Sequence, residues 1–143
     1  MENSKTVVTF GTFDLLHIGH VRILQRAHLL KGNGKLIVGV SSDKLNYTKK
    51  MKYPVFSQDE RIEILQSLKY VDQIFLEESL ELKPQYLMEH KADILVMGDD
   101  WKGKFDFCRN VPGLEHLQII YLPRTEDVST TEIIEKIIQL GLR

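Results

Sequence analysis

Two kinds of hydrophobic spacing alternate along the chain. Five short runs are continuously apolar and rich in β-branched residues, which is typical of strands buried on both faces of a sheet. These runs cover residues 6–10, 36–40, 71–76, 94–97 and 118–122. The stretches between them carry apolar residues three and four positions apart, the spacing of amphipathic helices. Alternating strands and helices predict an α/β fold, with a five-stranded parallel sheet, helices on both of its faces and right-handed crossovers.

Start and stop signals place four helices within these stretches. They are predicted over residues 21–30, after Ser57, over residues 84–90 and over residues 129–140. Ser57 and Glu60 form a capping box at the second helix. In the last helix, the residues predicted to face inward are Ile133, Ile134, Ile137 and Leu140. The long stretches 41–56 and 98–115 are predicted to be non-helical and to form binding loops or lids.

Bulk properties narrow the class of protein. The chain has 143 residues and a formal net charge of −1, which fits one domain over residues 1–143. The charge gives no reason to expect nucleic acid or an anionic membrane as a partner, so any anion site has to be local. No apolar stretch approaches the roughly 20 residues that span a bilayer. Because a polar N-terminus leads directly into a strand, we expect a cytoplasmic protein without a signal peptide.

The first polar segment after a strand is Gly11-Thr12-Phe13-Asp14-Leu15-Leu16-His17-Ile18-Gly19-His20. A helix that begins there offers free N–H groups and a favourable dipole to an anion, and the two imidazoles add donors. The pattern therefore predicts a phosphate site. The alternative interpretation is that His17 is a local cap and His20 a residue of the helix face. No Cys, His or carboxylate at suitable spacing completes a metal-ligand set, so metal ligation is not predicted.

A basic loop, Lys49-Lys50-Met51-Lys52, follows the second strand, and Arg61 lies on the next helix. Most such runs are solvated surface charge. At the predicted binding edge, however, mobile lysines could close over a triphosphate and neutralise charge as it develops.

Asp99, Asp100 and Trp101 follow the fourth strand. The aspartates could bond sugar hydroxyls or a base amino group, or orient Mg²⁺, and the tryptophan could stack on a ring. The structural alternative is a turn capped by an aspartate, with the tryptophan in the core.

A second anion site is predicted after the fifth strand. Ser129 or Thr130 caps the last helix, and Arg124, just before it, offers a bidentate fork to a phosphate. The serine-threonine pattern alone is an ordinary capping signature. Together with the first segment, it predicts two helix N-termini that hold one polyphosphate.

The segment from Gly11 to His20 resembles the HxGH signature of the nucleotidyltransferase superfamily. Arg124-Thr125 through Ser129-Thr130-Thr131 resembles its second, RTxGxSTT-type signature. With residues 97–106 and the length, nearly the whole chain is similar to the bacterial glycerol-3-phosphate cytidylyltransferase family. The resemblance implies a Rossmann-like single domain, usually a homodimer. It also implies that CTP, used with Mg²⁺, and glycerol 3-phosphate give CDP-glycerol and pyrophosphate, for teichoic acid or capsule synthesis.

The resemblance also assigns roles to residues of this sequence. The catalytic residues are His17, His20, Lys50, Lys52 and Arg124. The nucleotide-binding residues are Gly11, Thr12, Phe13, Gly19, Asp99, Asp100, Trp101, Arg124, Thr125, Ser129 and Thr130. The acceptor-binding residues are Lys50, Lys52, Arg61 and Lys69, and no residue is expected to ligate a metal.

Two positions depart from the family pattern. Lys69 stands where arginine is common, which keeps the charge but loses the planar fork. Asp127 stands where glycine is expected and brings a negative charge toward a polyphosphate. The acceptor is therefore left open to ethanolamine phosphate, choline phosphate or a sugar or amide phosphate. The sequence is also compatible with an adenylyltransferase or with a non-catalytic nucleotide-binding module.

Overall fold

The computed structural model describes residues 3–126 and 128–141. Its strands are β1 (Thr6–Gly11), β2 (Lys35–Ser41), β3 (Gln73–Glu77), β4 (Ile94–Gly98) and β5 (Gln118–Leu122). All neighbouring strands are parallel, in the order β3-β2-β1-β4-β5. The predicted five-stranded parallel sheet is therefore confirmed. The chain leaves β1 toward β3 and then returns to the other side of β1, so the strand order reverses between β1 and β4, where such sheets bind ligands.

Each face of the sheet has its own hydrophobic core. On one face, α1 (Ile18–Leu30) and α3 (Gln58–Gln66) contribute Leu24, Ala27 and Leu65. On the other, α4 (Lys83–Glu89) contributes Leu87, and the segment before β5 contributes Phe105 and Cys108. Strands covered on both sides need apolar residues at successive positions, which is why the runs in β1, β2 and β4 are continuous rather than alternating.

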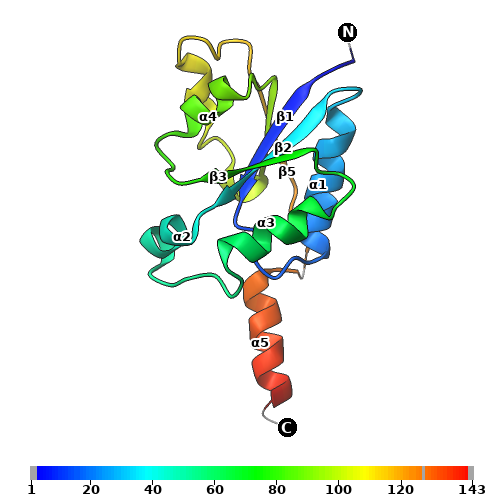
Figure 1. Cartoon of the computed structure of the whole chain (residues 1–143), viewed down its shortest axis with the longest axis vertical. Coiled ribbons are helices and arrows are strands. Elements are labelled where there is room, and N and C mark those ends of the chain that lie inside the picture. The colour runs from blue at the N-terminus through cyan, green and yellow to red at the C-terminus, as the bar shows by residue number, and fades with distance from the viewer. Residues whose placement is uncertain (1–2, 127, 142–143) are drawn as a thin grey trace.

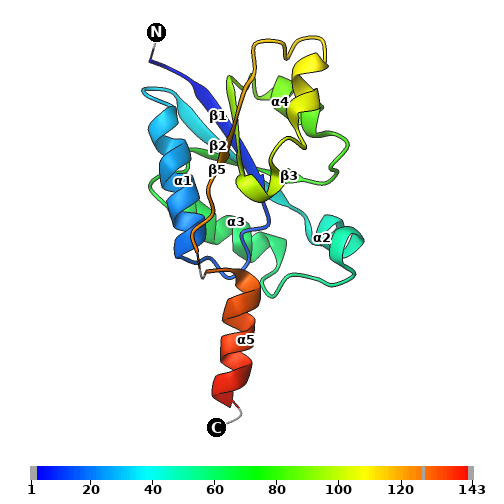
Figure 2. The same ribbon diagram turned by 180° about the vertical axis from the view of Figure 1, so that it is seen from behind.

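The last helix, α5 (Thr130–Gly141), extends away from the rest of the chain (Figures 1 and 2). Ile137 is 59% exposed and Leu140 is 48% exposed. The prediction that these two residues face inward is therefore wrong, because no other element of the described chain reaches that end of α5. Ile133 and Ile134, nearer the sheet, are partly buried.

An eight-residue helix, α2 (Asp43–Lys50), lies in the stretch predicted to be non-helical. Ser42 caps it by accepting a hydrogen bond from the Leu45 amide, and Lys49 and Lys50 lie in its last turn, where cations complement the helix dipole. Hydrophobic spacing missed this helix because its buried residues are one apolar side chain, Leu45, and one polar one, Asn46. The other long stretch contains only two short 3₁₀ helices, Asp99–Trp101 and Asp106–Asn110.

None of the helices within the described residues is long and apolar enough to cross a bilayer.

Candidate active site

A cavity of about 540 Å³ opens at the carboxyl ends of β1, β4 and β5. Its walls come from the N-termini of α1 and α5, the C-terminal end of α2 with the turn that follows, and the first 3₁₀ helix after β4. The volume lies within the range typical of small-molecule sites. The cavity thus occupies the place at which the strand order reverses, as the sequence predicts for a ligand site.

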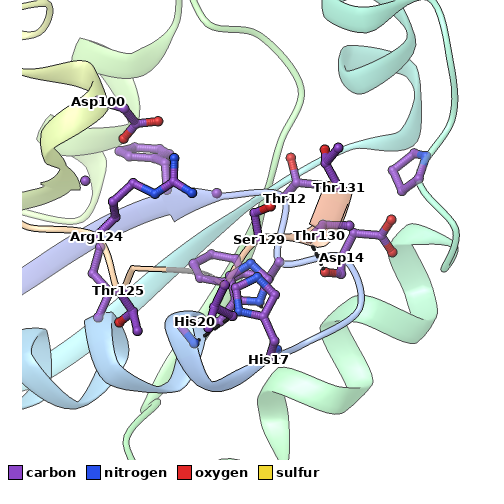
Figure 3. A pocket seen from close by; sticks show the side chains of 18 of the residues that line it. Thr12, Asp14, His17, His20, Asp100, Arg124, Thr125, Ser129, Thr130 and Thr131 are labelled. Carbon is purple, nitrogen blue, oxygen red and sulfur yellow. Dashed lines mark hydrogen bonds between the residues drawn. The ribbon is translucent and has the colours of Figure 1, made fainter. Parts of the chain in front are cut away.

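His17 and His20 stack on each other at the N-terminus of α1, with ring centroids 3.7 Å apart (Figure 3). The Nδ1 atom of His17 accepts a hydrogen bond from the Gly19 amide, at 3.0 Å. The Nδ1 atom of His20 accepts one from the His17 amide, at 3.2 Å. Because a backbone amide can only donate, both Nδ1 atoms are unprotonated, and a neutral ring then carries its proton on Nε2. His17 is therefore a helix cap, as one interpretation of the sequence proposes, and it lines the cavity as well.

Burial keeps both imidazoles neutral. It lowers the pKa of His17 below its ordinary value. Burial and the adjacent His17 lower the pKa of His20 to about 3. At neutral pH each ring can therefore donate one hydrogen bond from Nε2 without bringing a positive charge into the cavity.

The second anion-binding signature lines the same cavity at the start of α5. The Ser129 hydroxyl accepts from the Glu132 amide at 3.0 Å, so its own proton remains available to a ligand. The Thr130 hydroxyl donates to the backbone oxygen of Asp14 at 2.9 Å. This bond ties the N-terminus of α5 to the segment that carries the histidines. Thr125, near Arg124 in Figure 3, and Thr131, near Thr12, also line the cavity.

Arg124 and Asp100 lie at one end of the cavity in Figure 3. Arg124 has no ion-pair partner among the described residues. Trp101 lines the cavity and also packs against Phe105, with ring centroids 5.4 Å apart. It therefore contributes both to the cavity wall and to the edge of the hydrophobic core. Asp99 is exposed and does not line the cavity.

The basic residues divide into two groups. Lys50 and Lys52 line the cavity from the C-terminal end of α2 and the turn after it. Met51 between them adopts a left-handed conformation, with φ of 59°. Lys49 is half-buried and does not line the cavity. Burial is the main cause that lowers its pKa, and the charge of Glu77 opposes this shift. Two lysines of the basic run therefore line the cavity, and the third is partly buried outside it.

Arg61 and Lys69 are not brought to the cavity. Arg61 is fully buried and donates to the backbone oxygens of Phe56, Thr12 and Ser41 and to the carboxylate of Asp43 at 2.7 Å. Lys69 is exposed before β3, at the opposite edge of the sheet, with its ammonium 5.3 Å from the Tyr70 ring centroid. Neither side chain lines the cavity, and the acceptor role of these two residues stays a prediction. Asp127 lies outside the described residues.

Asp14, Asn46 and Arg26 are among the cavity residues that sequence reasoning missed. Asp14 accepts from the backbone amides of Val55 at 2.7 Å and Phe56 at 2.9 Å. Asn46 bonds the Thr12 hydroxyl, and Arg26 donates to the Pro123 oxygen. Asp14 could have been found from its place inside the histidine segment, whereas Asn46 and Arg26 carry no signal without the fold.

The glycines of the histidine segment act by making room for rings. A Cβ atom on Gly19 would lie 2.8 Å from Cε1 of His17. One on Gly11 would lie 2.8 Å from the ring of Phe13, which itself packs edge-on against His20 at 5.3 Å. Positive φ angles in this segment occur at Phe13 and Leu15 instead. The glycines therefore permit the packing that orients the two imidazoles.

Comparisons with known proteins agree with this geometry. The sequence model of the cytidylyltransferase-like family matches residues 8–136. The chain is 44% identical to glycerol-3-phosphate cytidylyltransferase of Bacillus subtilis (strain 168), over 93% of this chain and 97% of that protein. It is 39% identical to the enzyme of that name from Staphylococcus aureus (strain NCTC 8325 / PS 47), over 90% of this chain and 92% of that protein.

More distant matches include a longer enzyme and a solved structure. Choline-phosphate cytidylyltransferase A of Rattus norvegicus is 34% identical, over 96% of this chain but 38% of that protein. A crystal structure described as the lipopolysaccharide core biosynthesis protein from Thermoplasma volcanium GSS1 superimposes with a TM-score of 0.66 at 26% identity. The superposition covers 85% of this chain and 96% of that one. The match of the family model and the identity to these relatives over most of the chain show that it belongs to the cytidylyltransferase-like family.

Proposed function

We propose that the chain transfers the cytidylyl group of CTP to glycerol 3-phosphate, forming CDP-glycerol and pyrophosphate. The observation that carries this proposal is the stacked, neutral pair His17 and His20, which lines one cavity together with the α5 N-terminus. The similarity to two glycerol-3-phosphate cytidylyltransferases over at least 90% of each chain supports the choice of substrates.

In the proposed reaction, an oxygen of the acceptor phosphate attacks the α-phosphorus of CTP in line with the bond that breaks. A P–O bond forms as the bond from the α-phosphorus to its bridging oxygen breaks, and pyrophosphate leaves with that electron pair. The attacking oxygen is already anionic near neutral pH, so no strong general base is required. The Nε2–H groups of His17 and His20 stabilise the charge on the equatorial oxygens of the transition state.

Arg124 and the α5 N-terminus are proposed to hold the leaving diphosphate. Arg124 supplies a planar fork, and Ser129 supplies a hydroxyl proton beside free backbone amides. Lys50 and Lys52 are proposed to approach the triphosphate and the acceptor phosphate from the other wall. Asp100 and Trp101 are proposed to contact the nucleoside.

Mg²⁺ is proposed to arrive with CTP rather than to occupy a protein site. No group of three His, Cys, Asp or Glu side chains within residues 3–126 and 128–141 could hold a metal. Mg²⁺ commonly uses one or two carboxylates together with substrate phosphates, and Asp100 is a carboxylate in the cavity (Figure 3). Asp14 is less suited, because its oxygens already accept three backbone hydrogen bonds. A bound Mg²⁺ would reduce repulsion between the two anionic substrates.

An acceptor screen tests the proposed reaction directly. The purified chain is given CTP and Mg²⁺ with glycerol 3-phosphate, choline phosphate, ethanolamine phosphate or a sugar phosphate, and pyrophosphate release is measured. We expect the highest kcat/KM with glycerol 3-phosphate and a product of the mass of CDP-glycerol. Preference for another acceptor would overturn the substrate assignment. Absence of pyrophosphate release with every acceptor would indicate a non-catalytic nucleotide-binding module.

We also propose that the chain forms a homodimer through α5. Ile137 and Ile138, 59% and 57% exposed, and Leu140 form an apolar end of this helix that the described chain leaves uncovered. Light scattering coupled to gel filtration should give twice the 16.6 kDa chain mass. The Ile137→Asp/Ile138→Asp variant should give the monomer mass, and a monomeric wild-type chain would contradict the proposal.

A further inference from the structure

The orientation of one buried amide determines how a hydroxyl in the cavity can bond. Asn46, on α2, is 1% exposed. Its Nδ2 atom donates to the backbone oxygens of Ser41 at 3.2 Å and Ser42 at 2.9 Å. Because carbonyl oxygens only accept, the amide has a single possible orientation, and its Oδ1 atom faces Thr12.

Thr12 consequently uses its only hydroxyl proton inside the protein. Its Oγ1 atom lies 2.8 Å from Oδ1 of Asn46, and an amide oxygen cannot donate, so Thr12 is the donor. The backbone oxygen of Thr12 is held as well, by Nη1 of Arg61 at 2.8 Å. Two side chains from two helices therefore fix this residue, and the hydroxyl offers lone pairs, with no proton, to any ligand that reaches it.

A hydroxyl group that can only accept a hydrogen bond is unsuited to bind a phosphate oxygen, since both atoms would be acceptors. It is suited to a ligand that donates, such as an alcohol. Thr12 lines the cavity on the side away from Asp100 in Figure 3. Lys50, four residues after Asn46 and so on the same side of α2, also lines the cavity. This part of the wall thus combines a cation for a phosphate with an acceptor for a hydroxyl group.

We propose that Thr12 is a specificity-determining residue that accepts a hydrogen bond from a hydroxyl group of a polyol phosphate acceptor. Asn46 is the positioning residue, because it fixes the Thr12 hydroxyl in the accepting orientation. This inference rests on the proposed cytidylyl transfer and adds to it the means by which an alcohol-bearing acceptor is selected.

The test compares two acceptors that differ only in hydroxyl groups, glycerol 3-phosphate and n-propyl phosphate. The measured quantity is kcat/KM for glycerol 3-phosphate divided by kcat/KM for n-propyl phosphate, at constant concentrations of CTP and Mg²⁺. Thr12→Val removes the hydroxyl with little change of shape, and we expect the ratio to fall about three- to tenfold, as for one lost hydrogen bond. Thr12→Ser keeps the hydroxyl and should keep the ratio. An equal loss of kcat/KM with both acceptors in Thr12→Val would overturn the inference.

Asn46→Ala tests the positioning role. Removal of the Asn46 side chain leaves neither backbone oxygen that it bonded without a donor. Arg61 still donates to the Ser41 oxygen, and the backbone N–H of residue 46 still donates to the Ser42 oxygen. The freed Thr12 hydroxyl could then donate to a phosphate, so the ratio should fall as in Thr12→Val. Thr48→Val is the matched control, since Thr48 is exposed on the same helix and its hydroxyl donates to the Lys44 oxygen of that helix. An unchanged ratio in Asn46→Ala would show that Asn46 does not orient Thr12.

Failure of the proposed cytidylyl transfer and failure of the proposed Thr12 role would give different results. If the wild-type chain releases pyrophosphate with no acceptor, the cytidylyl transfer itself is wrong. If the wild-type chain is active but uses both acceptors with equal kcat/KM, only the role of Thr12 is wrong. Melting temperatures with and without CTP show whether each variant is folded and still binds the nucleotide.

Discussion

The walls of the cavity on α1 and on α2 are built in opposite ways. On α1, both imidazoles use one nitrogen to accept a backbone hydrogen bond, and they stack on each other. At the end of α2, Lys50 and Lys52 are exposed and have no ion-pair partner in the described part of the chain. One wall has its donors at fixed positions, whereas the other carries charge on long side chains that can adjust.

This difference separates two requirements of phosphate transfer. Donors that stabilise a transition state are most effective when they need no reorganisation during the reaction. Cations that neutralise incoming anions gain from mobility, because the substrates differ in position before and after transfer. We therefore expect substitutions in the α1 wall to act mainly on kcat, and substitutions in the α2 wall to act on KM and to depend on salt.

The largest effect is expected from loss of either imidazole. His17→Ala or His20→Ala removes a transition-state donor and should reduce kcat by about 100-fold or more, with a modest change in CTP affinity. Steady-state kinetics and CTP titration measure the two quantities. His28→Ala, on the same helix but outside the cavity, is the control. Near-normal turnover in a cavity-histidine variant would show that this histidine is only a cap.

A smaller loss is expected when the histidine is kept but displaced. Gly19→Ala places a methyl group against the His17 ring, at the 2.8 Å contact described above, and should lower kcat about 10- to 100-fold. Gly141→Ala, at the end of α5, meets no atom within 4 Å and should leave kcat unchanged. If Gly19→Ala retains full activity, the position of His17 is not fixed as tightly as the stacking indicates.

Loss of a lysine from the α2 wall should have a weaker effect on activity, and this effect should depend on salt. Lys50→Ala and Lys52→Ala should each lower kcat/KM by about tenfold at low salt, more than the roughly 1 kcal/mol of an exposed ion pair. Lys44→Ala removes a charge from the same helix outside the cavity and serves as the control. Kinetics identical to those of the control would contradict a role for this turn.

The last comparison concerns stability rather than activity, and it tests the burial of the α1 wall. In the unfolded chain, His20 becomes protonated as the pH falls below its ordinary pKa of 6.5. In the folded chain, its pKa is about 3, so it stays neutral until the pH is much lower. The free energy of unfolding should therefore decrease as pH falls through this window, by up to about 1.4 kcal/mol per pH unit from this residue. Urea unfolding of the wild type and His20→Asn at pH 7 and 4.5 measures it. An equal decrease in both proteins would exclude His20 as the cause.

The sequence allowed the sheet and most helices to be predicted because their signals are periodic. The central strands are buried on both faces, and Ser57 caps α3 through the Glu60 amide as expected. Short α2 escaped because it buries Asn46 rather than an apolar stripe. The end of α5 was misplaced because periodicity shows that a helix has an apolar side but not what covers it.

Within the site, segment position was more informative than residue charge. His17, His20, Arg124 and Ser129 follow strand ends and line the cavity as predicted. Arg61 was assigned to the acceptor by charge and by resemblance, yet its guanidinium is used by backbone oxygens and Asp43. A sequence cannot show whether a cation is already neutralised inside the fold.

The bonds of Asp14 connect three distant parts of the sequence. Its carboxylate joins the histidine segment to Val55 and Phe56, and its backbone oxygen joins the same segment to Thr130. These pieces cannot separate one at a time without breaking a shared anchor. Exchange of the amide hydrogens of Val55 and Phe56 should therefore slow together when a nucleotide is added, although neither belongs to a phosphate-binding signature.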